Sequence, residues 1–311
     1  MRKILTVSMA VLALVLGVVV PAAAAATASA SASTSRTKVI VLPGATSAEA
    51  IAAGPDDTFY AGDTTQGTIY RGDIHTGKVE VFIQPPTGTQ TVGMDLDVRD
   101  GLLFVAGGQA KGYVYSIRTR ALVASYDLGD PDVSFINGVT VTPYGAWFDD
   151  SYEPSLYFVP IVFGRPGPVH TLNLSGPAAG APGSFTINDI ASTPSGDRLL
   201  VDPTFAGELM TIDPRTGASK VVAGVDTPLA DGILLHGREL WVTRIDNHIN
   251  RYHLSADLSS GTLEKVIADP LFRTPLTSVR FGDRLAVVNS HLLDPGPPPT
   301  NPTFEVLVVH D

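Results

Sequence analysis

The sequence predicts an all-β fold, a six-bladed β-propeller in which each blade has four strands. Six segments open with a small or polar residue followed by alternating apolar residues, and they recur about every 46 residues, a period typical of propeller blades. Each segment is followed, at matching offsets, by a turn and further short apolar strands. A propeller repeats its sheets around an axis and thereby avoids long exposed strand edges.

The end of the chain indicates how the ring closes. The six repeated segments begin at Glu49, Gly93, Asn137, Asn188, Asp231 and Thr277. The sixth unit has three strands only, whereas an additional apolar strand at 38–42 precedes the first unit. We therefore expect the N-terminal strand to complete the last blade.

The N-terminal residues indicate export. Two basic residues precede the apolar run 4–20, and a tract of small residues follows, which is the layout of a secretory signal peptide over 1–30. A membrane anchor is the alternative, but the run is short for a membrane span and no second one follows. We expect a Ser/Thr linker at 31–36, a single propeller domain at 37–311, and a secreted bacterial protein with no stable membrane insertion.

Composition excludes several classes of function. Lys and Arg number 21 against 31 Asp and Glu, giving a formal net charge of -10, which is the wrong sign for binding nucleic acid. The sequence contains no cysteine, which excludes disulfides, thiolate metal sites and cysteine nucleophiles. Oxygen and nitrogen groups must therefore carry the chemistry. We expect a monomer that binds no nucleic acid.

Four of the six strand openings carry oxygen ligands. In a propeller the first strands line the central channel, so their openings gather at one mouth. Glu49, Asn137, Asn188 and Asp231 supply two carboxylates and two amides, a set that suits Ca²⁺ or, alternatively, Mg²⁺ or Mn²⁺. The Asn-Gly and Asp-Gly pairs at two of these openings are also typical of hairpin turns, an alternative that does not explain the recurrence of oxygen groups at one repeat position.

Loops on the same mouth add further polar groups. The connections from second to third strands contribute Asp63, Asp149, Asp150, Asp202, Asp246, His248 and His291. An acidic mouth favours a bound cation. Either histidine could act as a general acid or base, or be a solvated loop residue.

The repeat and the residues at its openings resemble the senescence marker protein/gluconolactonase family of six-bladed propellers. The resemblance implies that Glu49, Asn188 and Asp231 hold a divalent metal, that Asp231 also serves as the base, and that Asn137 contacts the substrate. Sugar-lactone members carry an Arg two residues before that Asn, where this chain has Phe135. This departure predicts a pocket more apolar than a sugar needs.

These observations predict a secreted, metal-dependent hydrolase that acts on a small lactone or ester. Its catalytic residues would be Asp231 and Asn137. Its predicted substrate pocket contains Phe135, Asp150, Asp202, His248 and His291. The alternative is a non-catalytic secreted propeller that binds a partner through its loops and holds a structural cation or none.

Overall fold

The computed structural model describes residues 37–181, 183–203, 207–294 and 303–311, which belong to one compact unit. The predicted signal peptide at 1–30 and the linker at 31–36 lie outside the described residues. No helix in the described part of the chain is long and apolar enough to cross a membrane.

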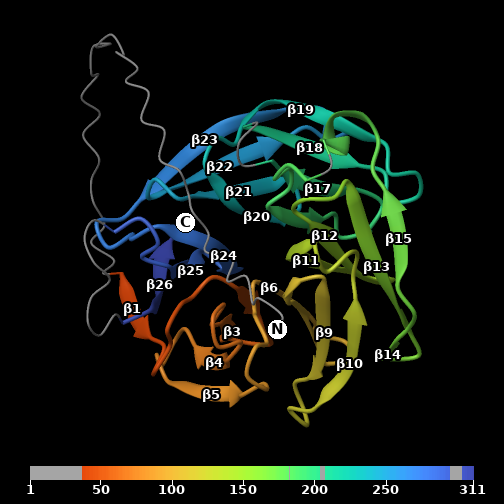
Figure 1. Ribbon diagram of the computed structural model, residues 1–311. Helices are drawn as coiled ribbons and strands as arrows, with labels where there is room; N and C mark the ends of the chain where they lie inside the picture. Colours follow the sequence, from red (N-terminus) through yellow and green to blue (C-terminus); the bar gives the residue numbers. More distant parts are fainter. Residues whose placement is uncertain (1–36, 182, 204–206, 295–302) are drawn as a thin grey trace, which may run out of the picture. The chain divides into compact units, whose positions relative to one another are not determined.

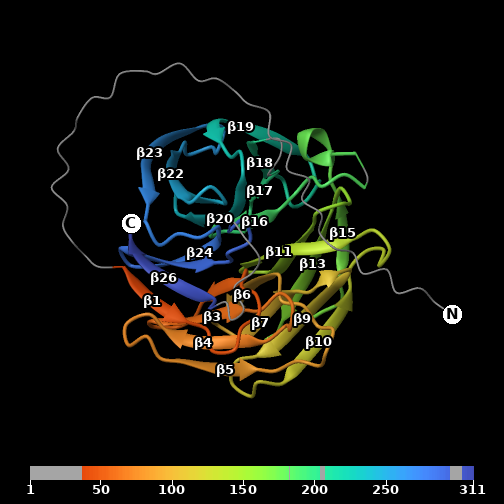
Figure 2. The same cartoon turned by 60° about the vertical axis from the view of Figure 1, so that its left-hand side comes forward.

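Six antiparallel sheets form a ring around a central axis (Figures 1 and 2), which confirms the six-bladed propeller. The first strand of each blade lies nearest the axis. These inner strands are β2 (Ile51–Ala53), β6 (Gly93–Asp97), β11 (Phe135–Thr142), β16 (Asp189–Ser192), β20 (Ala230–His236) and β24 (Pro275–Phe281). Each contacts the next in this order, and β24 contacts β2, so the ring is continuous.

The remaining strands follow outward from the axis. The second strands are β3 (Thr58–Gly62), β7 (Leu102–Ala106), β12 (Gly145–Asp150), β17 (Leu199–Asp202), β21 (Glu239–Arg244) and β25 (Arg284–Asn289). The third strands are β4 (Ile69–Asp73), β9 (Lys111–Ser116), β13 (Ser155–Val162), β18 (Glu208–Ile212), β22 (His248–Leu254) and β26 (Glu305–His310). The outer strands are β5 (Val79–Ile83), β10 (Leu122–Asp127), β15 (His170–Asn173), β19 (Ser219–Asp226), β23 (Gly261–Ala268) and β1 (Lys38–Val41). Two short strands and one helical turn complete the described elements, namely β8 (Gly108–Gln109), β14 (Arg165–Pro166) and the 3-10 helix η1 (Gly176–Ala179).

Strand β1 closes the ring, as the sequence predicts. It pairs antiparallel with β26, with Lys38 opposite Val308 and Ile40 opposite Val306. Ile40 is buried in a cluster that includes Val306 and Val308, whereas Val39 is about half exposed. The alternation of buried and exposed side chains along β1 is what a strand with one face on the core requires.

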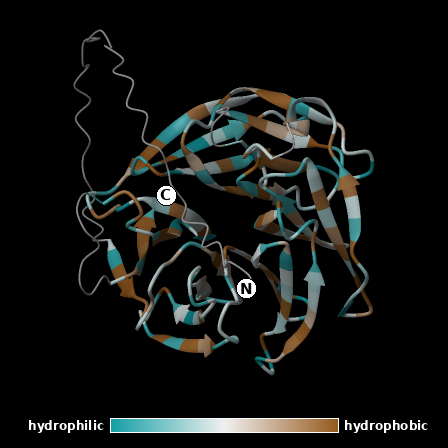
Figure 3. Ribbon diagram, viewed as in Figure 1, coloured by the Kyte–Doolittle hydropathy of each residue, from teal (hydrophilic) through white to brown (hydrophobic). Residues whose placement is uncertain are grey.

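Apolar side chains fill the spaces between neighbouring blades. All five residues of β7 are buried, because this second strand has a blade packed against each of its faces. Trp147 and Trp241 occupy second strands and are buried as well. Apolar and polar residues alternate along many outer strands in Figure 3, which matches sheets with a covered and a solvated face.

The β1 closure makes a testable prediction about stability. Replacing Ile40 by Ala removes buried methyl groups from the blade that holds the two ends of the ring together, so the free energy of unfolding should fall by about 2 to 5 kcal/mol. Val39→Ala on the exposed face of the same strand is the matched control and should change it by less than about 0.5 kcal/mol. Urea denaturation measures both. Equal effects would contradict the observed facing of the strand.

Candidate functional site

The predicted strand openings meet at the axis. The Asn137 side-chain amide donates a hydrogen bond to Oδ1 of Asn188 at 2.9 Å, and the Asn188 amide donates to the backbone carbonyl of Asp231 at 2.6 Å. On the other side of the ring, the Thr277 hydroxyl donates to the backbone carbonyl of Glu49. The structure therefore brings the openings of blades 3, 4 and 5 together, and likewise those of blades 6 and 1. We call Glu49, Asn137, Asn188 and Asp231 the axial group.

The Asn-Gly and Asp-Gly pairs do not form hairpin turns, so that alternative interpretation is wrong. Asn137 and Gly138 lie within β11, and Asp231 and Gly232 lie within β20. The pairing register shifts at both places, which marks bulges of the kind that re-aim side chains. A side chain on Gly138 would come within 2.4 Å of a carboxylate oxygen of Asp149, so only glycine fits there.

The axial carboxylates carry raised pKa values. Burial, followed by repulsion from Asp231, raises the pKa of Glu49 to about 8, although a hydrogen bond from the Thr64 hydroxyl at 3.1 Å opposes the shift. Burial likewise raises the pKa of Asp231 to about 7, against a lowering contribution from Asn188. Among the described residues, no lysine or arginine contributes to either shift. The site thus gathers negative charge without a positive side chain to balance it.

Two further carboxylates on inner strands escaped the sequence analysis. Asp189, directly after Asn188, accepts a hydrogen bond from the backbone amide of Ile233 in the next blade at 2.9 Å, and burial raises its pKa to about 7. Asp95 of blade 2 likewise accepts a hydrogen bond from the backbone amide of Val141 in blade 3 at 2.7 Å, and burial raises the pKa of Asp95 to about 6. The available signal was an acidic residue inside an otherwise apolar inner strand. Each carboxylate ties two neighbouring blades together at the channel.

Asp149 and Asp202 are fully buried behind the inner strands. Asp149 accepts a hydrogen bond from the backbone amide of Gly138 at 3.0 Å, and Asp202 accepts one from that of Asp189 at 3.0 Å. One oxygen of each carboxylate, Oδ1 of Asp149 and Oδ2 of Asp202, has no hydrogen-bond partner. Burial, and then the charge of Asp189, raises the pKa of both groups well above the usual range. They place two more carboxyl groups without a positive partner beside the axial group.

A cavity of about 310 Å³ runs along the axis. Residues from all six inner strands line it, and the carboxylates of Asp95 and Asp189 are its charged lining groups. Gly93 and Thr277 line it as well, so the cavity reaches the level of the strand openings. Two carboxylates therefore face the cavity, whereas the four residues of the axial group are not among those that line it.

Phe135 and Asp150, both predicted for the substrate pocket, lie next to each other in blade 3. The Phe135 backbone amide donates to Oδ1 of Asp150 at 3.2 Å, and the Tyr157 hydroxyl donates to Oδ2 at 3.1 Å. Asp150 is fully buried, so its oxygens hold the loop after β12 in place. Phe135 is partly exposed at the start of β11, two residues before Asn137.

Each of the two predicted histidines contacts acidic residues of its own blade. His248 is about half exposed, and its Nδ1 lies 3.6 Å from Oδ1 of Asp246 in blade 5. His291 lies between Asp294, at 2.7 Å from Nδ1, and Glu305, at 3.0 Å from Nε2. Among the described contacts, neither histidine touches the axial group. Their part in a substrate pocket stays a prediction.

The comparisons with known proteins identify the fold. No family model matches the sequence, and no curated protein does. Among solved structures, that of streptogramin B lyase is 16% identical over 81% of this chain and 80% of its own, with a TM-score of 0.59. The β-propeller domain of Myceliophteria thermophila Cps50 (Swd1) is 18% identical over 81% and 82%, with a TM-score of 0.58. The RRP9 WD40 repeats are 11% identical over 89% and 98%, with a TM-score of 0.64. At these identities the likeness shows the propeller fold alone.

The axial group fits a hard divalent cation. Its side chains offer carboxylate and amide oxygens, which Ca²⁺ prefers. The partnerless buried oxygens of Asp149 and Asp202 mark this part of the fold as short of positive charge, because buried carboxylates are normally paired or bound to metal. The side-chain amide of Asn188 already contacts the backbone carbonyl of Asp231, so these two residues lie side by side at the axis.

The raised pKa values predict an unusual pH dependence in the metal-free protein. The folded state keeps protons on Glu49 and Asp231 that the unfolded chain releases, so stability in EDTA should fall as pH rises from about 4.5 to about 8. Glu49→Gln imitates the protonated side chain. It should flatten this decline and stabilise the metal-free protein at pH 8 by about 1 kcal/mol or more, since one pKa unit corresponds to about 1.4 kcal/mol.

The measurement is the free energy of unfolding at several pH values, with the exposed Glu80→Gln as the control, which should follow the wild type. Parallel pH curves for wild type and Glu49→Gln would mean that Glu49 ionises as it does in the unfolded chain.

Proposed function

We propose that the protein is a secreted, divalent-cation-dependent hydrolase of a small lactone or ester. Glu49, Asn188 and Asp231 would hold the cation, for which Ca²⁺ is the first choice. The supporting observation is the convergence of these oxygen groups from separate blades, without a lysine or arginine among the groups that shift their pKa values. The resemblance of the same residues to the gluconolactonase pattern points in the same direction.

A cation held there would polarise the substrate carbonyl and stabilise the negative charge that develops on its oxygen. Asp231 supplies the base. Burial raises the pKa of Asp231 in the metal-free protein, and a bound cation would lower it again, which would keep the carboxylate ionised and able to accept a proton. It would take a proton from the attacking water and return it to the alkoxide that leaves when the ester C–O bond breaks. One water is consumed, and an acid and an alcohol are formed.

Asn137 would orient the substrate or the attacking water. Its side-chain amide now donates to Asn188 and to the Ser151 hydroxyl at 3.2 Å, so it lies beside the proposed ligands. Phe135, partly exposed at the start of the same strand, would contact the apolar part of the substrate. The presence of Phe135 where sugar-lactone enzymes carry an arginine favours an apolar lactone or ester over a polyol.

Calcium should stabilise the protein through the axial group. A ligand that binds only the folded state stabilises it by about 2.7 kcal/mol at 100 times its Kd. We therefore expect added Ca²⁺ to raise the Tm of protein stripped with EDTA, and Asp231→Asn to abolish the increase. Asp132→Asn, an exposed acidic residue in the loop before β11, is the control and should keep it. An undiminished increase in the Tm of Asp231→Asn, or no increase in the Tm of the wild type, would contradict an axial cation.

Hydrolysis should depend on the same carboxylate. On a panel of apolar lactones and aryl esters, turnover should require the divalent cation, and Asp231→Asn should lower kcat by about 100-fold or more without unfolding the protein. Asn137→Ala should lower kcat/KM while calcium still raises the Tm, because this residue is assigned to substrate and not to the cation. A calcium response without turnover on any substrate would instead support the non-catalytic binding propeller.

A further inference from the structure

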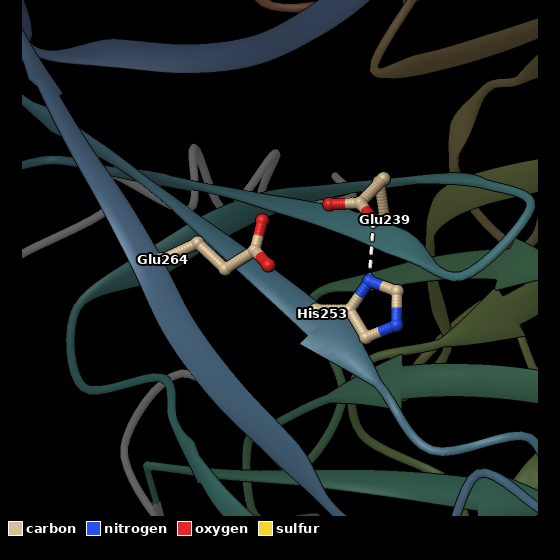
Figure 4. Close-up of side chains that lie close together, drawn as sticks. All are labelled: Glu239, His253 and Glu264. Atoms are coloured by element: carbon tan, nitrogen blue, oxygen red, sulfur yellow. Dashed lines mark hydrogen bonds and ion pairs between the residues drawn. The ribbon is translucent and has the colours of Figure 1, made fainter.

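A second group of metal-ligating side chains lies in the outer half of blade 5. Glu239 on β21, His253 on β22 and Glu264 on β23 each offer one ligand atom, and these atoms all lie within 4.8 Å of one another (Figure 4). Within the described part of the chain, no other three histidine or acidic side chains meet this condition. In Figure 4 the carboxylate of Glu239 meets a ring nitrogen of His253, and the Glu264 carboxylate is directed toward the same space.

The pairing of the three strands explains this arrangement. Glu239 and His253 are direct cross-strand partners, so their side chains lie on the same face of the sheet. Between β22 and β23, Arg251 pairs with Lys265 and Tyr252 with Leu263, which leaves Glu264 as the extra residue of a bulge. A bulge turns a side chain away from the regular alternation. Here it directs Glu264 toward the face that carries His253.

The donor set suits zinc. Imidazole nitrogen and carboxylate oxygen bind Zn²⁺ at about 2.0 to 2.2 Å, and tetrahedral geometry then separates neighbouring ligand atoms by about 3.3 Å. Nδ1 of His253 and Oε1 of Glu239 are now 2.5 Å apart, a contact that requires a proton between them. Zinc would replace that proton. All three side chains are between 31% and 40% exposed, so an ion can reach them and keep water as its fourth ligand.

Arg251 is the competing positive charge. Its guanidinium lies 3.4 Å from Oε2 of Glu264 and 3.8 Å from Oε2 of Glu239, and its Nη1 is held by both carboxylate oxygens of Asp311 at 3.2 Å. It thus approaches the glutamates through one oxygen of each. Oε2 of Glu239 and Nε of Arg251 are buried without hydrogen-bond partners, so this ion pairing leaves polar atoms unsatisfied. Oε1 of Glu239 remains turned toward His253.

We propose that Glu239, His253 and Glu264 form a zinc site, separate from the axial group. Arg251 stays anchored on Asp311 and balances the remaining charge of the glutamates. The ion fastens the outer strand β23 to β21 and β22. This role does not depend on the proposed hydrolase activity. Among the described contacts, none of the three residues touches a side chain of the axial group, and Glu239 pairs with His236, at the opposite end of β20 from Asp231.

The test is a titration of the full protein with Zn²⁺ in the presence of excess Ca²⁺, which occupies an axial cation site if one exists. Wild type should bind a zinc equivalent that His253→Ala binds at least about 100-fold more weakly. Removing even an outer-shell partner of a metal ligand costs about 10- to 100-fold in affinity, and removing the ligand itself should cost no less. The matched control is His310→Ala, which removes another partly exposed histidine paired with a single carboxylate, that of Asp283. His310→Ala should bind zinc as the wild type does.

A second readout covers the case in which His253→Ala fails to fold. Glu264→Gln keeps the shape of the side chain, so it should fold, lose the tight zinc equivalent, and lose the slowing of amide hydrogen exchange that zinc produces in β23 of the wild type. Absence of a zinc equivalent in the wild type would overturn the proposal. So would equal zinc binding by wild type, His253→Ala and Glu264→Gln.

Discussion

The closure of the ring by β1 is the interaction on which the rest of the structure depends. The strand that begins the described chain supplies the outer edge of the blade that ends it, through four backbone pairs with β26 and the burial of Ile40. Each inner strand of the propeller contacts its two neighbours, so the position of any one opening at the axis is fixed only when the whole circle is complete. The geometry of the axial group, which comes from four different blades, therefore depends on the pairing of β1 with β26 at the outside of the ring.

Closure also creates an electrostatic problem at the axis. Backbone geometry brings the openings of the inner strands together whatever side chains they carry, and here the openings and their neighbours carry acids. Burial raises the pKa values of Glu49, Asp189 and Asp231, and the neighbouring negative charges raise them further for Glu49 and Asp189. Asp189 and Asp202 also hold backbone amides, which gives them a structural use. That use does not explain why Glu49, whose side chain accepts from the Thr64 hydroxyl, is acidic. Strongly perturbed carboxylates in a channel mouth are typical of functional sites.

The repeat made the fold and the axial group predictable. A fixed period places equivalent residues at equivalent positions, so reading one column of the repeat was enough to find Glu49, Asn137, Asn188 and Asp231. Asp149 and Asp202 could be assigned to the same mouth but not to full burial, because burial depends on how the second strand packs behind the first and against the neighbouring blades. The bulges themselves, at Asn137 and at Asp231, resembled turns because both structures favour the same Asn-Gly and Asp-Gly pairs.

The blade 5 cluster lay beyond sequence analysis for a different reason. Glu239 and His253 are 14 residues apart and meet through the register of a hairpin, and Glu264 joins them because it is a bulged residue. No spacing within the sequence therefore indicates the group.

The axial group and the blade 5 cluster also differ in their chemistry. The axial group offers only oxygen atoms, partly or fully buried and without a cationic side chain, which favours a hard cation of high charge. The blade 5 cluster includes an imidazole, is partly exposed, and shares its glutamates with Arg251. The positive charge of Arg251 weakens the binding of an ion such as Ca²⁺, which is held by electrostatic attraction alone. An ion that forms a strong bond with nitrogen is therefore favoured there. If both proposals hold, this acidic propeller has two chemically distinct cation sites, and the selectivity of each would follow from the atoms and the competing charges that the strands bring to it.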